Sequence, residues 1–404
     1  MQRVAYLCSE YPAISHTFIF REIQSLRQAG LEVYPITARP SANLAKMTLQ
    51  EQEEAKQTKI LQRITPLAGI HALLRIIGRS PLGFSKMTVQ AISLCFSGPI
   101  SPGKALAYWA EAILLIHWLQ NNNIEHVHEH FANPTALLTL LAKRYGGISY
   151  SLSVHGPDVF FRVDSSLLAL KLREAVFIRC ISHYCRSQLW LISPHATWSK
   201  FYIIRCGVDT RHYHPVKKKE KVLGAEMAIL CVGRLCPAKG QHVLLKACAI
   251  LREKKRAFQL TLVGDGEERQ SLERLAMRLN LGEYVVFTGS LGQDAVEAHY
   301  CQADLFVLPS FAEGVPVVLM EAMAQEIPTI STCITGIPEL IEHGRHGLLA
   351  TVADVDNLAA LMIKIFDNRR WAQGMAQEGR RQVISRYNQQ QNAQELVTLF
   401  RDTI

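Results

Sequence analysis

The sequence gives no indication of a disulfide framework, although it contains ten cysteines. They are scattered, several lie in apolar strand-like segments, and no two form a C-x-x-C pair. We therefore expect free thiols in a reducing compartment. The same spacing argues against both a disulfide-rich scaffold and a cysteine zinc site.

Acidic residues are also in short supply, with 35 Asp and Glu against 44 Lys and Arg and a formal net charge of +9. This sign suits an acidic partner, and nucleic acid, an anionic membrane surface and a polyphosphate substrate all qualify. Nucleic acid has no further support, because the sequence lacks a helix-turn-helix signal and a platform of interleaved aromatic and basic residues.

No apolar run is long enough to cross a membrane, since the longest, residues 105–119, is interrupted by Glu111 and His117. Only five apolar residues separate Arg3 from Ser9, too few for the apolar region of a secretory leader. The chain has 404 residues, of which 49% are hydrophobic and 20% charged. We expect a folded cytoplasmic protein of two or three domains, soluble or bound peripherally to a membrane.

Two common glycine motifs for phosphate binding are missing as well. The first strand, helix and strand, within residues 4–37, contain no G-x-G-x-x-G and so do not predict a dinucleotide site. The loop at 233–240 is not a Walker A loop, because its Gly-Lys pair is reversed and no Ser or Thr follows. It does carry Arg234 and Lys239 after the apolar strand 227–232, where two cations can face a diphosphate.

Apolar strand-like runs alternate with helix-like segments through both halves of the chain, with about six parallel strands in each. We predict an α/β protein of two facing, doubly wound, Rossmann-like domains whose carboxyl strand ends line a cleft. The charged segment 215–221 is expected to be a solvated linker, which places the domains at 1–214 and 215–385.

Residues 49–119 look helical, with breaks at Ser80-Pro81 and Gly98-Pro99 and with Lys and Arg spaced among Leu, Ile and Ala. They are interpreted as a helical insert that packs on the first sheet. They also suit a basic amphipathic surface for anionic lipid headgroups, and the two interpretations are compatible.

The most informative stretch is 303–325, where an apolar strand, a loop and a helix follow one another. Pro316 suits the first helical position, so Glu313 precedes the helix and Glu321 lies about a turn and a half inside it. The two carboxylates could merely complement the helix dipole and meet solvent. Alternatively, Glu321 binds a ribose diol and Glu313 the hydroxyls of the group that a diphosphate carries, beside an anion site of backbone amides. The residues of that anion site are Gly314, Val315, Val317 and Val318.

Histidines mark two further positions. Strict alternation puts His126, His128 and His130 on one face of a strand, where they could ligate zinc or be merely hydrogen-bonded. His155 precedes a glycine at the end of another strand, a place where an imidazole is either structural or exposed at the binding edge of the sheet.

In order and spacing, these segments resemble family-4 retaining glycosyltransferases. The segments are G-R at 233–234 with K-G at 239–240, G-D-G at 264–266, the Glu313-to-Glu321 stretch, and G-I-P-E-L at 336–340 with Gly347. In the N-terminal half, V-H-E-H-F at 127–131 and H-G-P-D at 155–158 look like the H-x-H-F and H-G-x-D segments of that family.

The resemblance implies a GT-B fold and a UDP-, GDP- or ADP-sugar donor, with no other cofactor and no required metal. Arg234 and Lys239 would hold the donor diphosphate, and Glu321 the ribose. Glu313 would position the transferred sugar, and His155 would meet that sugar from the first domain.

The resemblance extends to the glycines and to the acceptor side. Gly233 and Gly264 would line the donor site, and a C-terminal helix at 386–404 would return to the first domain. The first loop looks closer to the S-E-T-F segment of bacterial exopolysaccharide, colanic-acid-type glycosyltransferases, with His16 after Ser15 in place of their Glu. The implied acceptor is a saccharide or a lipid-linked saccharide.

Two other functions compete with a retaining transferase. A GT-B epimerase or phosphorylase would need its own acid and base set or a pyridoxal-binding lysine, neither of which the sequence indicates. A catalytically silent sugar-nucleotide-binding scaffold is the alternative outside enzymes, and the complete charged set argues against it. Retention would follow either from front-face attack, which we favour, or from a covalent intermediate.

Overall fold

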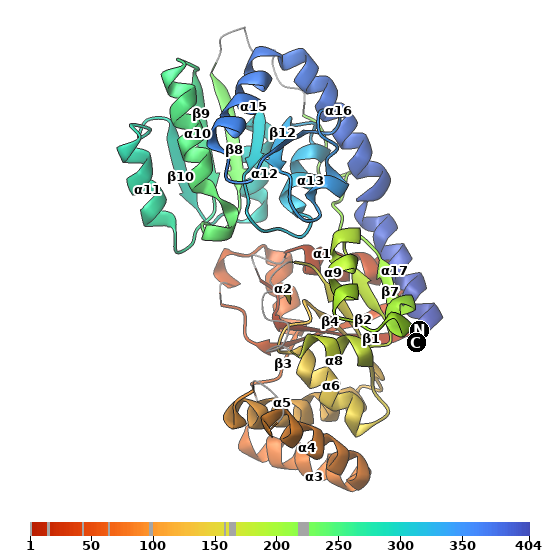
Figure 1. Ribbon diagram of the computed structural model, residues 1–404. Helices are drawn as coiled ribbons and strands as arrows, with labels where there is room; N and C mark the ends of the chain where they lie inside the picture. The colour runs from red at the N-terminus through yellow and green to blue at the C-terminus, as the bar shows by residue number, and fades with distance from the viewer. Residues whose placement is uncertain are drawn as a thin grey trace. The chain divides into compact units, whose positions relative to one another are not determined.

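The computed structural model describes residues 2–13, 17–42, 44–63, 65–96, 100–156, 159–160, 167–216 and 226–404. These residues form two compact units, each of which contains one parallel sheet with helices around it (Figure 1). The first unit comprises Met1–Ile204 and Ala393–Ile404, and the second comprises Arg205–Asn392. Most of the expected linker, residues 217–221, lies outside the described residues.

The first unit has a seven-stranded sheet in the order β3-β2-β1-β4-β5-β6-β7, and every pairing is parallel. The strands are β1 Arg3–Glu10, β2 Glu32–Arg39, β3 Lys59–Ile60, β4 His126–His130, β5 Ser149–Val154, β6 Ile178–Cys180 and β7 Phe201–Ile203. The helices are α1 Thr17–Gln28, α2 Leu49–Gln57, α3 Pro66–Arg79, α4 Pro81–Phe96, α5 Pro102–Asn121, α6 Ala136–Tyr145, α8 Leu168–Glu174 and α9 His183–Leu191. Because β1 lies next to β4, the strand order reverses between these two strands.

The second unit has a six-stranded parallel sheet in the order β10-β9-β8-β11-β12-β13. Its strands are β8 Met227–Val232, β9 Phe258–Val263, β10 Val285–Gly289, β11 Leu305–Leu308, β12 Thr329–Thr332 and β13 Leu348–Ala350. Its helices are α10 Gln241–Glu253, α11 Arg269–Arg278, α12 Gln293–Gln302, α13 Val317–Ala324, α14 Ile337–Leu340, α15 Val355–Asp367 and α16 Arg369–Arg386. The prediction of two α/β, Rossmann-like domains is therefore confirmed.

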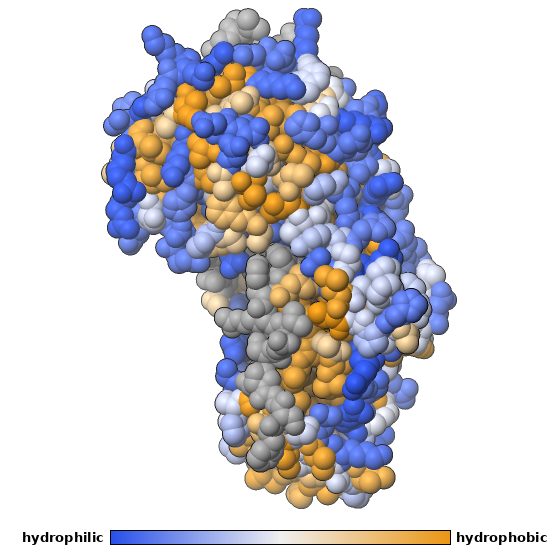
Figure 2. All heavy atoms as spheres, in the orientation of Figure 1, coloured by the Kyte–Doolittle hydropathy of each residue, from blue (hydrophilic) through white to orange (hydrophobic). Residues whose placement is uncertain are grey.

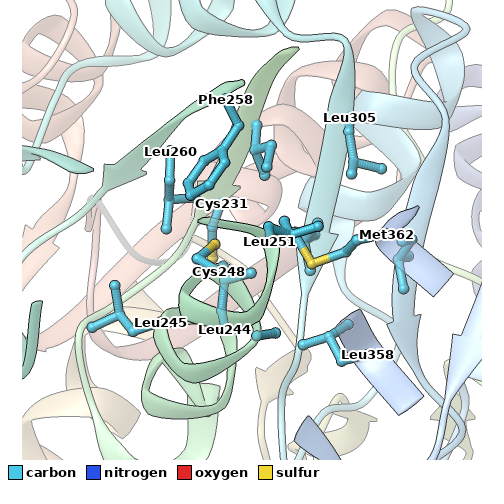
Figure 3. Close-up of a cluster of buried hydrophobic side chains, with 14 of the residues drawn as sticks. Cys231, Leu244, Leu245, Cys248, Leu251, Phe258, Leu260, Leu305, Leu358 and Met362 are labelled. Atoms are coloured by element: carbon cyan, nitrogen blue, oxygen red, sulfur yellow. The ribbon is translucent and has the colours of Figure 1, made fainter. Parts of the chain in front are cut away.

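The hydrophobic core of the second unit explains why the sequences of these strands are unbroken apolar runs. Helices α10 and α15 cover the sheet, and their side chains meet those of β8, β9 and β11 (Figure 3). The residues include Cys231, Leu244, Cys248, Leu251, Phe258, Leu260, Leu305, Leu358 and Met362, each at most 2% exposed. The cysteines here are small apolar core residues, as expected for free thiols.

The helical insert divides into α2, α3, α4 and α5. Thr48 and Glu51 form a capping box at the start of α2, and Thr65 with Pro66 starts α3. The break expected at Ser80 separates α3 from α4, whereas the second expected break, residues 98–99, lies outside the described residues. None of the described helices combines the length and the hydrophobicity needed to span a bilayer.

One local boundary differs from the sequence prediction. Pro316 is the N-cap of α13 and not its first helical residue, since its backbone is extended. Helix α6 begins at Ala136, after a turn in which the Asn133 side chain accepts a hydrogen bond from the amide of Thr135. Strand β7 is three residues long and ends at Ile203.

The C-terminal helix α17, Gln389–Thr403, contributes its last two-thirds to the first unit. Leu396, Val397 and Phe400 are fully buried, and the ring of Phe400 lies 5.3 Å from that of Phe177 and 5.2 Å from that of His128, centroid to centroid. The end of the chain thus completes a core whose other residues come from the first 204.

We expect Phe400→Ala to lower the free energy of unfolding of the first unit by about 3–5 kcal/mol, because it leaves a cavity among buried rings. Four of the five tryptophans lie in this unit, so fluorescence in a Trp371→Phe background follows its unfolding in urea. The control is Glu395→Ala, an exposed change on the same helix. Equal stability of the two variants would contradict the packing of α17 described here.

Candidate active site

The predicted donor-site residues of the second unit lie on two neighbouring loops. Strands β8 and β11 pair directly although they are not consecutive in the chain, so the loops after them meet at the switch point of the sheet. The backbone amide of Phe311 donates a 2.8 Å hydrogen bond to the carbonyl of Ala238 and ties the loops together. Doubly wound sheets bind ligands at this position.

Glycines allow the loops to approach so closely. Gly240 has φ of +64°, and a Cβ there would lie 2.2 Å from the carbonyl oxygen of Pro309. Gly264 has φ of +141°, and its Cβ would lie 2.0 Å from the carbonyl oxygen of Gly233. Any side chain at these two positions would push the loops apart.

Lys239 and Glu313 form an ion pair across the two loops. The ammonium nitrogen lies 2.5 Å from Glu313 Oε1, and the Ser310 hydroxyl donates to the same oxygen at 2.7 Å. Thr335 fixes the backbone by donating to the Glu313 carbonyl at 2.6 Å. With 8% of its surface exposed, Glu313 is a held carboxylate, which disfavours the interpretation of a solvated dipole partner.

The other predicted residues of this unit lie on the same loops and helix. Gly233 and Arg234 begin the first loop, where Arg234 is exposed. Gly314 and Val315 precede α13, and Val317 and Val318 are its first two residues, whose amides have no carbonyl one turn earlier in the helix. The structure thus brings Arg234, Lys239, Glu313 and this helix start to one edge of one sheet.

Glu321 is buried in the middle of α13, with 6% of its surface exposed. The hydroxyl of Tyr300 donates to its Oε2 at 3.0 Å and lies 3.2 Å from the carbonyl of Val318. The sequence analysis missed Tyr300, because a single tyrosine in α12 carries no signal that it faces a helix 21 residues later. A buried carboxylate held by one hydroxyl keeps acceptor capacity for a diol.

His155 lies in the first unit, at the end of β5, and is 7% exposed. Its Nε2 is 2.9 Å from Nδ1 of His130, at the end of the neighbouring strand β4. His130 Nε2 in turn lies 3.5 Å from Glu22 Oε1 on α1. The structure therefore orients His155 through a second histidine that faces a carboxylate.

The buried guanidinium of Arg179 completes this group. Arg179 bonds to Glu22 through Nη1 and donates from Nε to the carbonyl of Ile204 at 2.9 Å, while the Tyr6 hydroxyl donates to Glu22 at 3.2 Å. Burial alone would raise the pKa of Glu22, but Arg179, aided by His130, holds that pKa below its usual value.

The other two histidines of the alternating strand form hydrogen bonds with serines. His126 bonds to Ser149 and Ser151, and His128 bonds to Ser151 and Ser153, each within 2.8 Å. Burial lowers the pKa of His126 to about 3 and that of His128 well below its usual value, so both rings are neutral.

A metal does not fit this cluster. Among the described residues, Glu22, His128 and His130 offer ligand atoms within 4.8 Å of one another. The Arg179 guanidinium already neutralises that carboxylate, and serines engage both nitrogens of His128. The hydrogen-bonded interpretation therefore holds in preference to zinc. Ser15, His16 and Asp158, which the sequence analysis also singled out, lie outside the described residues.

We expect Glu22→Gln to lower the free energy of unfolding of the first unit by about 3–5 kcal/mol at neutral pH, because it leaves a buried guanidinium without its anion. The depressed pKa of Glu22 means that its contribution is complete at neutral pH and is lost as the pH falls through the folded-state pKa. The difference between wild type and variant should therefore shrink in acid. Urea unfolding by fluorescence in the Trp371→Phe background measures it.

The control for this prediction is Glu32→Gln, which removes the partner of Arg3 in an exposed ion pair worth at most about 1 kcal/mol. If Glu22→Gln were as stable as Glu32→Gln, the buried pair would not stabilise the unit.

Comparison with known proteins relates part of this chain to a described family of domains. Residues 215–382 match the model described as "Glycosyl transferases group 1". The putative colanic acid biosynthesis glycosyltransferase WcaL of Escherichia coli (strain K12) is 28% identical over 425 residues, with 98% of this chain and 99% of that protein covered. The amylovoran biosynthesis glycosyltransferase AmsK of Erwinia amylovora is 25% identical over 420 residues, with 96% of each chain covered.

A solved structure shares the fold of the chain. HepE of Anabaena in complex with UDP-glucose matches with a TM-score of 0.75 and 15% identity, and the match covers 100% of each chain. At this identity the likeness concerns the fold. The chain therefore carries a glycosyl transferases group 1 domain at residues 215–382 within a GT-B fold, as the resemblance of its motifs predicts.

Proposed function

We propose that this protein is a retaining glycosyltransferase that moves a sugar from a nucleotide-diphosphate sugar to a saccharide or lipid-linked saccharide. The observation that carries this proposal is the Lys239–Glu313 pair at the switch point of the second sheet, beside the start of α13. It combines a cation for phosphate, free helix amides and a carboxylate for sugar hydroxyls within two joined loops.

Each residue then has a role set by its chemistry. Lys239 and Arg234 neutralise the diphosphate, and the helix amides share its charge. Glu321, held by Tyr300, accepts hydrogen bonds from the ribose diol. When the diphosphate takes the Lys239 ammonium, Glu313 is released to accept hydrogen bonds from the transferred sugar. His155, oriented by His130, approaches that sugar from the first unit.

The chain's own positive groups support the leaving diphosphate, so we propose a reaction that requires no metal. For the chemical step we favour front-face attack. The bond from the sugar's anomeric carbon to the phosphate oxygen breaks, and the acceptor oxygen bonds to the same face. The departing phosphate takes the proton of the acceptor hydroxyl.

The proposals for the acceptor and for the location of the protein are supported by the names of its relatives. WcaL and AmsK are named as glycosyltransferases of colanic acid and amylovoran biosynthesis. We propose a growing polysaccharide or glycolipid acceptor, and a protein that works in the cytoplasm or on the inner face of a membrane. Ten free cysteines support a reducing compartment.

We expect Lys239→Ala and Glu321→Ala each to weaken binding of the cognate nucleotide-sugar by about tenfold to a hundredfold, because each removes a charge-assisted contact. Calorimetry with UDP-, GDP- and ADP-sugars in EDTA measures this and identifies the base. Lys246→Ala and Glu253→Ala on α10 are exposed controls with matched residue types. Absence of binding to every donor would overturn the transferase proposal, whereas binding without any turnover would favour a catalytically silent scaffold.

We expect Glu313→Gln to separate binding from turnover. The amide keeps the size of the carboxylate, so affinity for the free nucleoside diphosphate should stay within about threefold of wild type. Transfer or slow donor hydrolysis should fall by about a hundredfold, because the carboxylate that orients the sugar is gone. Unchanged turnover would remove Glu313 from the reaction. Inversion of the product's anomeric configuration, read by NMR, would refute retention.

A further inference from the structure

Helices α3, α4 and α5 present a surface of exposed aliphatic side chains that the donor chemistry does not use. We call it the basic apolar surface. Its aliphatic residues are Leu67, Ile70 and Leu74 on α3, Leu82, Val89 and Ile92 on α4, and Leu106 on α5, each more than half exposed. In Figure 2, hydrophobic residues gather over the end of the first unit that α3 and α4 form.

This exposure follows from how the helices are anchored. In α3 the opposite face, with Ala72 and Ile76, is fully buried, and the Tyr145 hydroxyl of α6 donates to the Ile76 carbonyl at 2.9 Å. Leu67 and Leu74 are seven residues apart and share the outward face. The fold therefore fixes α3 by one side and leaves an apolar stripe on the other.

The charges around this stripe are predominantly positive. From Thr65 to Ala110 the sequence contains no Asp or Glu, and the acidic residue of α5, Glu111, is partly buried and accepts a 3.0 Å hydrogen bond from Gln62. Its basic residues in this range are Arg75, Arg79, Lys86 and Lys104, all exposed. Arg75 and Arg79 flank the stripe on α3, and Lys86 lies between Leu82 and Val89 on α4.

We propose that the basic apolar surface docks on a bilayer that contains anionic lipid, with α3 and α4 lying in the headgroup region. Aliphatic side chains beside Lys and Arg are the composition of helices that lie in a membrane interface. The aliphatic residues enter the acyl boundary, and the basic residues meet lipid phosphates.

A second copy of the chain fits this surface poorly. A two-fold interface would place the same patch on both subunits, so the four exposed cations of one copy would face the same four cations of the other, with no acidic residue in α3 or α4 to offset them. An anionic bilayer supplies the missing negative charge. The inference goes beyond the proposed transfer reaction, and its test needs no turnover, so either can fail without the other.

The test is flotation of the full chain with vesicles of phosphatidylcholine alone or mixed with phosphatidylglycerol. We expect binding only to the mixed vesicles, weakened by salt. Arg75→Glu with Arg79→Glu should lower the partition coefficient by at least about tenfold, because each basic residue near an anionic surface strengthens binding severalfold. Leu67→Ser with Leu74→Ser should lower binding without changing the preference for anionic lipid.

The controls are substitutions of the same kinds on α11 of the second unit, outside the basic apolar surface. Arg274 and Arg278 have the same spacing of four residues and the same exposure class as Arg75 and Arg79, and Met277 is 72% exposed, close to Leu67 at 78%. Arg274→Glu with Arg278→Glu, and Met277→Ser, should bind vesicles like wild type. Circular dichroism verifies that every variant is folded.

Three results would overturn the inference. One is equal binding to both kinds of vesicle, and another is equal loss in the α11 controls. The third is a dimer, seen by light scattering, that Leu67→Ser with Leu74→Ser dissociates, because a second copy would then cover the surface.

Discussion

The pairing of β8 with β11 decides where the charges of the candidate active site meet. These strands are separated by β9 and β10 in the chain but are adjacent in the sheet. Their register places the loop with Lys239 beside the loop with Glu313, and backbone hydrogen bonds from Phe311 and Ala312 to the carbonyl of Ala238 join them. Gly240 lets these two loops approach, and Gly264 lets the loop after β9 approach Gly233, because each glycine lacks the Cβ atom that would keep the backbones apart.

The first unit follows the same topological rule with different chemistry. There the switch point lies between β1 and β4. A network of buried charged and hydrogen-bonded side chains lies near it, whereas the second unit has a loop with the cations Arg234 and Lys239 at its switch point. Arg179 and Glu22 cancel each other's charge in the core, and their hydrogen bonds orient His130 and, through it, His155. A buried pair of this kind contributes little net stability compared with apolar residues, so its value lies in a defined imidazole orientation.

Elements with strong local signals could be predicted from the sequence. Strand 227–232 has the expected bounds, because its apolar run is closed by Gly233. A parallel sheet places the loops of Lys239 and Glu313 at the same edge, and the doubly wound strand order, in which β8 pairs with β11, makes them adjacent.

Partners far apart in sequence could not be predicted. Glu22 and Arg179 are 157 residues apart, and neither position carries a pattern that names the other. The role of Tyr300 could not be predicted either, since an isolated tyrosine in a helix gives no indication of its contact with Glu321. The two-residue strand β3 is below the length at which periodicity can be read.

The positions of the basic residues in the fold say more about their partners than the net charge does. A net charge of +9 alone suits many kinds of acidic partner. In the structure, one of the positive groups, Lys239, is held in a pair of loops suited to a diphosphate. Other positive groups lie on α3 to α5 beside aliphatic side chains. The first arrangement holds a partly buried lysine against a carboxylate, whereas the second leaves four cations exposed, with no acidic residue in α3 or α4. Cations of the first kind select a compact ligand, and those of the second kind suit an extended anionic surface. The proposed donor site and the proposed membrane surface therefore use different basic residues on different units, so the two proposals do not compete for the same charges.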